Sequence, residues 1–481
     1  MSLSTALNSA ASGLQLASRG AQIVADNIAN ASTEGFGARS ITQAARVTGS
    51  AGSGVVMTGI TRQSDPALMG EIRGANAAQS GTDSLLHFWS NIEKSIGTPG
   101  EPGALGTHIF SLEEALKQAS IQPESQSSLQ KVVFAAQNLA GKINDIDTGL
   151  QSARDRADAS ISQDVDRLNT LFEQINALNS DIARQKLSGG FPHSLEDARQ
   201  NLIDQASAII PLKEIIRPDG RSMILGADGT VFVDRDVTAL EFRRTPSPAA
   251  GETVGAGDLG RLVINGREVS ETSPLLQSGS LATAFQIRDV HIPQVQQDLD
   301  HFAADLVNRF SDTDLDPTLP AGAFGIFAIR AETTMPADLA GISSRVTLNP
   351  IIAADDGGTF WRIRDGLHAS SPGPVSENAI IARMGDALLA FTPDLSGTRP
   401  NAQLQGHADV LLSNVATQRL ATETQTAYTS ARVSALQELF GANGVDTDAE
   451  LQKLLVLEKS YAANARVMVA ADSMLRTLLE M

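Results

Sequence analysis

Residues 3–36 read LSTALNSAASGLQLASRGAQIVADNIANASTEGF, and an apolar or small side chain recurs there at alternating steps of four and three. The recurring positions are Leu3, Leu7, Ala10, Leu14, Ala17, Ala21, Val24, Ile28 and Ala31. This spacing predicts a single helix with an unbroken heptad seam, and at ~1.5 Å per residue the helix would be about 43 Å long. Residues 49–54, which follow, are rich in Gly and Ser and offer no apolar face. The seam therefore has to pack against a helix from elsewhere.

The C-terminal residues provide a helix of the same kind. One helical face carries Leu451, Leu454, Tyr461, Ala465, Met468, Leu475 and Leu479, with Leu455, Ala462 and Val469 beside it. The two ends could pair with each other and close a compact domain, because chain termini often lie close together. Seams that are rich in Ala bury little surface per residue, so we favour packing against helices of other copies over self-closure alone.

The end of the first helix is marked by ADNIANASTEGF, residues 25–36. Asn30 and Gly35 suit a helix end that needs left-handed backbone angles. The hydroxyl of Thr33 can bind backbone groups that the ending helix leaves free. We therefore expect the helix to stop here, beside an interface.

This stretch resembles the N-terminal signature of the bacterial flagellar axial proteins, the rod, hook and hook-associated family. EKSYAANARVMVAADSMLRTLLEM, residues 458–481, is similar to the C-terminal signature of the same family. The resemblance implies that Asp26, Asn27, Ile28, Ala29, Asn30, Thr33, Gly35 and Phe36 close an inner-core helix, with counterparts at Tyr461, Ala462, Asn464, Ala465, Asp472, Met474 and Leu475. The predicted assembly interface consists of Leu3, Leu7, Leu14, Val24, Asn27, Ile28, Asn30, Gly35, Phe36, Leu451, Leu455, Tyr461, Ala465, Val469, Leu475 and Leu479.

The sequence between the ends predicts a body of long helices. Residues 125–187 are nearly free of Gly and Pro and carry apolar residues at steps of three and four, which predicts one long helix or two end to end. Shorter helices are expected at 111–120 and 194–210, where Ser is followed by acidic residues. Further helices are expected at 377–391 and 406–440. Pro293 predicts a kink or break in the helical run around it.

After Pro211 the pattern changes to short apolar runs separated by turn pairs. Asp219-Gly220, Asp228-Gly229 and Asn265-Gly266 each predict a β-hairpin turn. Residues 311–375 are rich in Pro, Gly and Thr, which predicts an insert of strands and loops. The fold class is therefore mainly α with β inserts: paired terminal coiled-coil helices, a long-helix bundle, a small β excursion and a small β-rich inserted domain.

We expect three parts. Residues 1–36 plus 446–481 form a terminal coiled-coil core domain, and residues 37–310 plus 376–445 form the helical body with hairpins near 211–270. Residues 311–375 form the inserted domain. The order of INALNSDIARQ, NLIDQAS, the hairpins and LLQSGSLATAFQIRD is similar to that of hook-associated members of the family rather than rod or hook proteins.

Composition and charge exclude several classes of function. The chain has no Cys, which removes disulfides, thiolate ligands and Cys nucleophiles. Its formal charge of −18 would repel phosphate backbones, so nucleic acid is not an expected partner. The sequence has no run of the ~20 apolar residues that a membrane helix needs, so membrane insertion is not expected. It has no cleaved signal peptide pattern either, which leaves export by another route open.

Motifs that could carry chemistry lack their required context. GAGDLG at 255–260 follows a Pro/Ala/Gly loop rather than a strand, which favours a flexible loop over a dinucleotide site. DTDLDP at 312–317 has Pro317 where a calcium loop needs Gly, which favours a solvated acidic turn. His291 and His301 are too far apart for a helical metal pair. We expect no catalytic residues, metal or cofactors.

The resemblance implies a structural adaptor whose copies assemble through their terminal helices into a junction between flagellar hook and filament. Implied partners are copies of itself, the hook protein, and the next hook-associated junction protein or the filament. The resemblance also implies export through the flagellar type III channel to the extracellular flagellum, with a cytoplasmic chaperone on the C-terminal helix. The alternative is a soluble enzyme with a site between the helical body and the insert.

Overall fold

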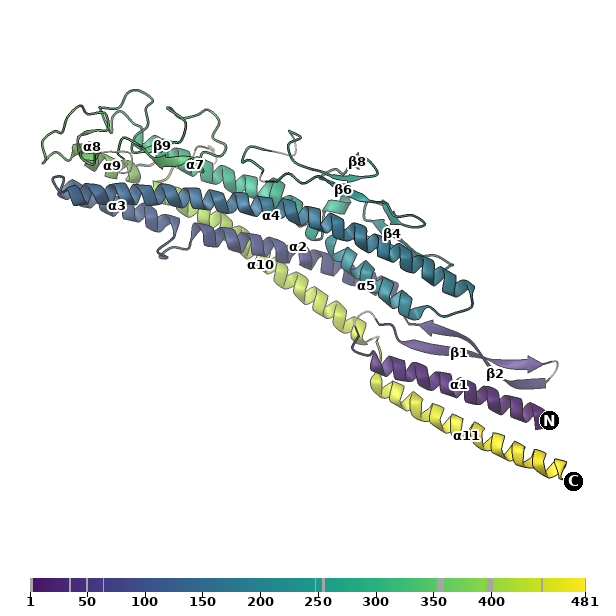
Figure 1. Ribbon diagram of the computed structural model, residues 1–481. Coiled ribbons are helices and arrows are strands. Elements are labelled where there is room, and N and C mark those ends of the chain that lie inside the picture. The colour runs from purple at the N-terminus through teal and green to yellow at the C-terminus, as the bar shows by residue number, and fades with distance from the viewer. Residues whose placement is uncertain are drawn as a thin grey trace.

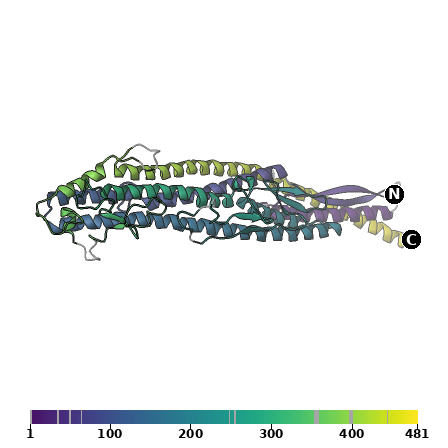
Figure 2. The same cartoon turned by 90° about the horizontal axis from the view of Figure 1, so that it is seen from above.

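The computed structural model describes residues 3–33, 36–48, 51–63, 65–246, 248–252, 256–352, 359–393, 395, 401–442 and 444–480. Most of these residues are helical, and the strands form small, separate sheets. The predicted class, mainly α with β inserts, is therefore confirmed. Figures 1 and 2 show an elongated molecule with both termini at one end.

The longest helix, α4 (Gln126–Leu187), runs along most of the body (Figure 1) and confirms the long helix predicted over 125–187. Ser125 caps its start, because the side chain accepts a hydrogen bond from the amide of Ser128. Gly141 and Gly149 do not interrupt it. Apolar residues at steps of three and four form one buried stripe, as their spacing predicts. The stripe includes Leu139, Ile143, Ile146, Leu150, Ile161, Leu168, Phe172, Ile175 and Ile182.

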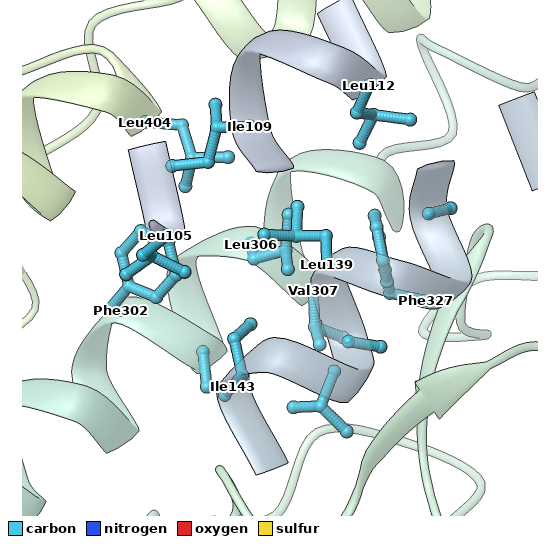
Figure 3. Close-up of a cluster of buried hydrophobic side chains, with 14 of the residues drawn as sticks. Leu105, Ile109, Leu112, Leu139, Ile143, Phe302, Leu306, Val307, Phe327 and Leu404 are labelled. Atoms are coloured by element: carbon cyan, nitrogen blue, oxygen red, sulfur yellow. The ribbon is translucent and has the colours of Figure 1, made fainter. Parts of the chain in front are cut away.

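The main core of the body lies where α4 meets α3 (Leu105–Ile121), α7 (Ile292–Phe310), α9 (Ala379–Leu389) and α10 (Leu404–Ala442). Figure 3 shows side chains of α3, α4, α7 and α10, together with Phe327, converging on one cluster. The labelled members are Leu105, Ile109, Leu112, Leu139, Ile143, Phe302, Leu306, Val307, Phe327 and Leu404. Because bulky apolar side chains dominate this cluster, its burial is the main source of the body's stability.

Residues 311–375 share this core. Their described elements are β9 (Phe327–Ile329), which pairs antiparallel with β10 (Val346–Leu348), and the short helix α8 (Trp361–Asp365). The ring of Phe327 packs against that of Phe310 on α7, with centroids 5.3 Å apart. The strands are short, and loops make up much of the segment. The assignment of this segment to a separate domain stays a prediction, although its packing ties it closely to the body.

A second core lies beside the C-terminal half of α4, against α5 (His193–Ile209) and two three-stranded sheets. One sheet consists of β3 (Leu212–Ile216), β4 (Ser222–Gly226) and β5 (Val231–Val233). The other consists of β6 (Leu240–Phe242), β7 (Leu262–Ile264) and β8 (Arg267–Glu268). The stacked rings of Phe172 and Phe232, 5.0 Å apart, join α4 to the first sheet.

The predicted turn pairs form the hairpins. Gly220 and Gly229 have φ values of 87° and 86°, in the region that glycine adopts without steric cost. Asn265 and Gly266 both have positive φ, 53° and 70°, between β7 and β8. Two consecutive residues with positive φ are typical of a type I′ hairpin, which the Asn-Gly pair predicts.

The helical run around Pro293 is continuous rather than broken. A 3-10 turn, η1 (Pro274–Leu276), precedes α6 (Ser280–Gln286), and the π-helical turn η2 (Ile287–His291) leads directly into α7. Pro293 stands in the first turn of α7, directly after η2, so its missing amide proton removes one hydrogen bond from the run without ending it. The wider π turn before it takes up the distortion that the sequence predicted as a kink.

Two helix starts differ from the prediction. The helix expected to begin at Ser111 begins at Leu105, so Ser111 lies inside α3 and its hydroxyl donates to the carbonyl oxygen of Thr107 at 2.8 Å. The helix expected from Ser194 begins at His193. A Ser followed by acidic residues is compatible with a helix interior when the hydroxyl bonds back to the preceding turn.

The prediction lacked two elements. The hairpin of β1 (Arg39–Thr48) and β2 (Ala51–Arg62) follows the first helix, and α2 (Pro66–Ile96) follows the hairpin. Asp65 caps α2, and Pro66 opens it. This helix runs antiparallel to α10, since Thr82 contacts Thr429 and Arg419 pairs with Glu93 at 2.5 Å. The middle of α2 is rich in Gly, Ala and Ser, so its sequence has no bulky seam to signal a helix.

Two buried carboxyl groups anchor the segment 311–375 to the body. The hydroxyl oxygen of Ser343 lies 2.9 Å from Oδ1 of Asp147 on α4 and 2.6 Å from Oδ1 of Asp300 on α7. The amides of Gly341 and Ser343 donate to Asp300, and the amide nitrogen of Gln296 lies 2.8 Å from Asp147. None of these donors carries a charge. Burial raises the pKa of both carboxyl groups above the ordinary value of 3.8.

A core substitution should separate burial from helix propensity within α4. Leu139→Ala removes a fully buried side chain and should lower the free energy of unfolding by about 2–5 kcal/mol. Leu187→Ala makes the same change on the same helix at a side chain that is 89% exposed. It should change the free energy of unfolding by about 0.5 kcal/mol or less. Urea unfolding measures both. Equal losses would contradict the assigned core.

The pH dependence of stability should report the anchoring carboxyl groups. Because the folded state raises both pKa values, their contribution to the free energy of unfolding is largest below about pH 3.8 and falls as pH rises through the raised values. Asp147→Asn should flatten that fall in urea unfolding measured at several pH values. Asp145→Asn, an exposed position on the same helix, should leave the profile unchanged. Matching profiles for the two variants would contradict the assignment.

Candidate functional site: the paired chain ends

The terminal helices α1 (Leu3–Ala29) and α11 (Thr447–Leu479) pack antiparallel at one end of the molecule (Figure 1). Three contacts set their register. Gly13 faces Asn464, Gly20 faces Leu457, and Asn27 bonds Glu450 at 3.1 Å. Each step of seven residues along α1 matches a step of seven backward along α11, as expected for a heptad seam. The chain ends therefore do pair with each other, which the sequence had left as the less favoured arrangement.

Glycine allows the two helices to approach closely. A Cβ atom at Gly20 would lie 2.9 Å from Cδ2 of Leu457, and one at Gly13 would lie 2.6 Å from the side chain of Asn464. Contacts this short require the neighbouring side chain to move. The seam thus depends on small residues on α1, and it buries less apolar surface than a Leu-rich seam of equal length would.

The predicted seam of α1 is only partly buried. Ala10, Ala17 and Val24, which are seven residues apart, are buried, and so are Gly20, Ile23 and Asn27. Leu3, Leu7, Leu14 and Ile28 are half-buried. The larger side chains of the predicted seam therefore retain surface for a further contact.

The hairpin β1–β2 covers another face of α1. The hydroxyl oxygen of Ser12 accepts a hydrogen bond from the amide of Val55 at 3.2 Å. Phe36 is half-buried, and the guanidinium of Arg39 lies over its ring at 4.9 Å. The hairpin, α1 and α11 together enclose a groove of about 1030 Å³, whose lining includes Gly13, Gly20, Val55, Lys453 and Val456. We name these three elements, α1, α11 and the hairpin, the terminal unit.

Asn27 is the polar centre of the terminal unit. Its side chain is fully buried, and its Nδ2 donates to the carbonyl oxygen of Arg39 at 2.8 Å and to Glu450. Its Oδ1 accepts from the amide of Arg39 at 3.0 Å. Glu450 is also buried and pairs with Lys453 at 2.6 Å. A single amide side chain thus joins α1, β1 and α11, a role that the signature resemblance did not specify.

The end of α1 differs from the prediction at Asn30. This residue does not adopt left-handed angles, because in the described part of the chain only Asn265 and Ala331 do so among non-glycine residues. Its amide continues the helix by donating to the carbonyl of Asp26, and its side chain donates to the same carbonyl at 2.9 Å. Thr33 bonds the side chain of Asn30 at 3.2 Å. Gly35 lies outside the described residues.

The predicted interface residues of α11 fall on two faces. Leu451, Leu455 and Val469 lie on the outer face and are 49%, 57% and 70% exposed. Tyr461, which is 49% exposed, lies between Leu457 and Asn464 at the edge of the inner face. Val456, Val467 and Met474 are also exposed. Ala465 and Leu475 are half-buried, and the side chain of Leu479 lies outside the described residues. Because water-exposed apolar groups concentrated on one helix are typical of interaction surfaces, this outer face is the candidate contact surface.

The motifs set aside in the sequence have structural roles. The ring of His291 packs against Trp89 at 5.2 Å and Phe88 at 6.4 Å. Asp316, from the expected solvated acidic turn, is instead fully buried and accepts a hydrogen bond from the amide of Leu367 at 2.8 Å. Among the described residues, no group of three or more His, Asp or Glu residues is placed to hold a metal ion. In the same part of the chain, no helix has the length and apolar character needed to cross a membrane.

Comparison with known families agrees with the arrangement of the chain. Residues 89–315, from the end of α2 through α7, match the model of the flagellar hook-associated protein FlgK helical domain. Residues 7–36 match the flagella basal body rod protein model, and residues 441–481 match the C-terminal model of the flagellar basal body rod FlgEFG proteins. The chain is 22% identical to flagellar hook-associated protein 1 of Bacillus subtilis (strain 168), over 94% of this chain and 93% of the relative. The chain is therefore similar over most of its length to the flagellar hook-associated protein 1 family.

Other members of the hook-associated protein 1 family align over a smaller share of their length. The protein of Escherichia coli (strain K12) is 25% identical over 74% of this chain and 66% of the relative. That of Salmonella typhimurium is 24% identical over 64% of this chain and 56% of the relative. The solved flagellar hook junction protein FlgK from Burkholderia pseudomallei superposes with a TM-score of 0.45 at 17% identity, covering 54% of this chain and 46% of that chain.

Replacing the buried amide should loosen the terminal unit. Asn27→Ala would leave the backbone groups of Arg39 and the carboxylate of Glu450 without their partner, at a cost of about 1–3 kcal/mol. Amides of α1 and α11 should then exchange with solvent about tenfold faster or more. Asn30→Ala, which removes only a local bond at the helix end, should leave exchange in α11 unchanged. Unaltered protection in the Asn27→Ala protein would rule out this role.

Proposed function

We propose that this chain is a structural adaptor of the bacterial flagellum, whose copies form a junction zone between the hook and the filament. The observation that carries the proposal is the exposed apolar outer face of α11. This face lies on the helix that carries the C-terminal family match, beside the helix that carries the N-terminal one.

The arrangement of α11 lets two contacts operate at the same time. Its inner face, which includes Glu450, Leu457 and Asn464, is used by α1. Its outer face, which includes Leu455 and Val469, points to water in the single chain. Full burial of a Leu or Val side chain stabilises a contact by about 1.5–3 kcal/mol. Several such residues along one helix suffice for a stable contact with neighbouring copies.

At its two ends, the proposed junction has to contact other flagellar proteins as well as copies of this chain. In the proposed assembly, copies of this chain contact one another laterally through their terminal units. The hook protein contacts the zone on one side, and the next hook-associated junction protein or the filament contacts it on the other. The relatives are named for their association with the hook, which supports a place beside it.

The proposed location is the extracellular flagellum, reached through the flagellar type III channel without a cleaved signal peptide. Before export, the outer face of α11 would be an aggregation hazard, because exposed apolar patches associate non-specifically. A cytoplasmic chaperone that covers the C-terminal helix would remove that hazard. The chaperone and the junction partners would therefore use the same apolar face at different times.

The enzyme alternative has no support from the contact between body and insert. The groups there that could do acid–base chemistry are Asp147, Asp300 and Ser343, which are nearly buried and bonded to one another. Of these groups only Asp147 borders a groove between α4 and residues 340–344, and its carboxylate is nearly buried and bonded to Ser343 and Gln296. We therefore propose no catalytic activity and no cofactor for this chain.

Charges on the outer face of α11 should block assembly and leave the fold intact. The double variant Leu455→Asp, Val469→Asp changes two exposed side chains, so its circular dichroism and melting temperature should match those of the parent. In cells that depend on this chain, hooks should lack attached filaments and subunits should appear free in the medium. Charge burial in the contact costs several kcal/mol per ion, which explains the loss.

The control is Leu187→Asp, which places a charge on an exposed Leu of α4 in the body; this side chain is 89% exposed, against 57% for Leu455 and 70% for Val469. This variant should build normal junctions. Normal filament attachment in the α11 double variant would refute the proposed role of the outer face. Retention of the double variant inside the cell would indicate an export defect instead, and would assign the face to the export machinery.

A further inference from the structure

A polar joint connects the terminal unit to the body. The carboxylate of Asp197, in the first turns of α5, accepts a hydrogen bond from the guanidinium of Arg39 and another from that of Arg62, each at 2.6 Å. These two arginines stand opposite each other at the base of the β1–β2 hairpin. All three side chains are largely buried, so their charges are poorly screened by water. One carboxylate therefore holds both strands of the hairpin against α5.

The joint extends through the hairpin to both terminal helices. The backbone of Arg39 bonds Asn27 on α1, and Asn27 bonds Glu450 on α11. Covalent connections between the terminal unit and the body exist at two places, between β2 and α2 and between α10 and α11. The joint adds a third, non-covalent connection. Each added connection removes some of the orientations that the terminal unit could otherwise take relative to the body.

His193 adds a titratable group to the joint. Its Nε2 lies 3.0 Å from the carbonyl oxygen of Ile60 on β2, and its Nδ1 lies 2.9 Å from the carboxylate of Glu196. The other carboxylate oxygen of Glu196 pairs with Lys186 of α4 at 2.9 Å. The hydrogen bond from His193 is the largest cause that lowers the pKa of Glu196 to about 2, so this carboxyl group stays ionised above that pH.

The two partners of His193 are both acceptors. A carbonyl oxygen and an ionised carboxylate can only accept hydrogen bonds. Both contacts are hydrogen bonds at the same time only in the doubly protonated imidazolium, in which each ring nitrogen donates. Charged groups gathered around the ring are Glu196, Asp197 and Arg199 on α5, Lys186 on α4, Arg39 on β1 and Arg62 on β2. The ring also stacks on Phe191, with centroids 6.3 Å apart.

We propose that this joint is a proton-operated latch, in which doubly protonated His193 fastens the hairpin to α5 beside the Asp197 clamp. Loss of one proton leaves the clamp as the main fastening, so the terminal unit takes a wider range of orientations. The latch is closed at acidic pH and opens as the pH rises. The lower limit of the closed range is set by Glu196, which gives up its bond only as the pH falls towards about 2. The latch does not depend on the proposed junction role, because it acts within one chain.

The absence of Cys makes the latch directly measurable, because engineered cysteines are the only labelling sites. We would place spin labels at Ala44→Cys on β1 and Ala177→Cys on α4, two exposed alanines on either side of the joint. Pulsed electron paramagnetic resonance gives the distribution of distances between the two spin labels. The full-length chain would be measured at about pH 5.5 and about pH 8.5, on either side of the range in which histidines ordinarily titrate.

The latch predicts a distribution about twofold wider or more at the higher pH, since releasing a contact enlarges the set of orientations. In His193→Gln the side chain at position 193 has no group that titrates in this range. The distance distribution of this variant should therefore have the same width at both pH values. Asp197→Asn weakens the arginine clamp and should give a wide distribution at both. Circular dichroism would verify that each variant is folded.

Three results would overturn the latch. Equal widths for the parent protein at both pH values would show that the joint does not respond to protons. A pH response that persists in His193→Gln would assign the effect to another group. A narrow distribution for Asp197→Asn at both pH values would show that the clamp does not hold the hairpin.

Discussion

The antiparallel contact between α1 and α11 constrains the rest of the structure. Because Asn27 on α1 meets Glu450 on α11, the chain has to leave the terminal unit and return to it at the same place. Everything between these residues is therefore an excursion that runs out and comes back. The helix α2 leads away from the terminal unit and the antiparallel helix α10 leads back to it, and the long helix α4 lies alongside them (Figure 1). The elongated shape follows from helix lengths and from this closure condition together.

The two ends of the excursion are stabilised by different chemistry. In the body, α3, α4, α7 and α10 bury bulky apolar side chains such as Leu139 and Phe302 in one core. In the terminal unit, the seam relies on glycines and on hydrogen bonds of Asn27. Apolar burial is non-directional, whereas hydrogen bonds of a buried amide accept one geometry only. The burial of large apolar side chains thus stabilises the body. In the terminal unit, the hydrogen bonds of Asn27 fix the register of α1 against α11, and little apolar surface is buried.

Sequence reasoning predicted the features that depend on local spacing. The buried stripe of α4, the turn at Asn265-Gly266 and the helical character of both ends all follow from periodicity or turn chemistry, and the structure agrees with them. It failed where long-range contacts decide. The middle of α2 has no bulky seam, because α2 and α10 meet there through small residues, Thr82 on α2 and Thr429 on α10. Likewise, no local signal shows that Phe327 belongs to the core of the body.

The interface prediction illustrates the same limit at single residues. Periodicity identified the apolar positions of α11 but could not tell which of them face α1, since both faces of this helix carry apolar side chains. Leu455 and Val469 are exposed, whereas Leu475 is half-buried, although all three belonged to one predicted set. The inner positions, such as Leu457 and Asn464, are defined by Gly20 and Gly13 on the other helix. That information lies more than 400 residues away in the sequence.

Self-pairing and assembly are compatible because they use different faces of α11. The sequence presented them as alternatives, since one seam on each helix can serve only one partner. The structure gives α11 one face, with Glu450, Leu457 and Asn464, which α1 covers, and an exposed apolar face, which a single chain leaves in water. Pairing with α1 thereby orients the apolar face before any partner arrives, and a preorganised surface loses less conformational entropy on binding than an isolated helix does. The intramolecular contact is in this way a precondition for the proposed intermolecular one.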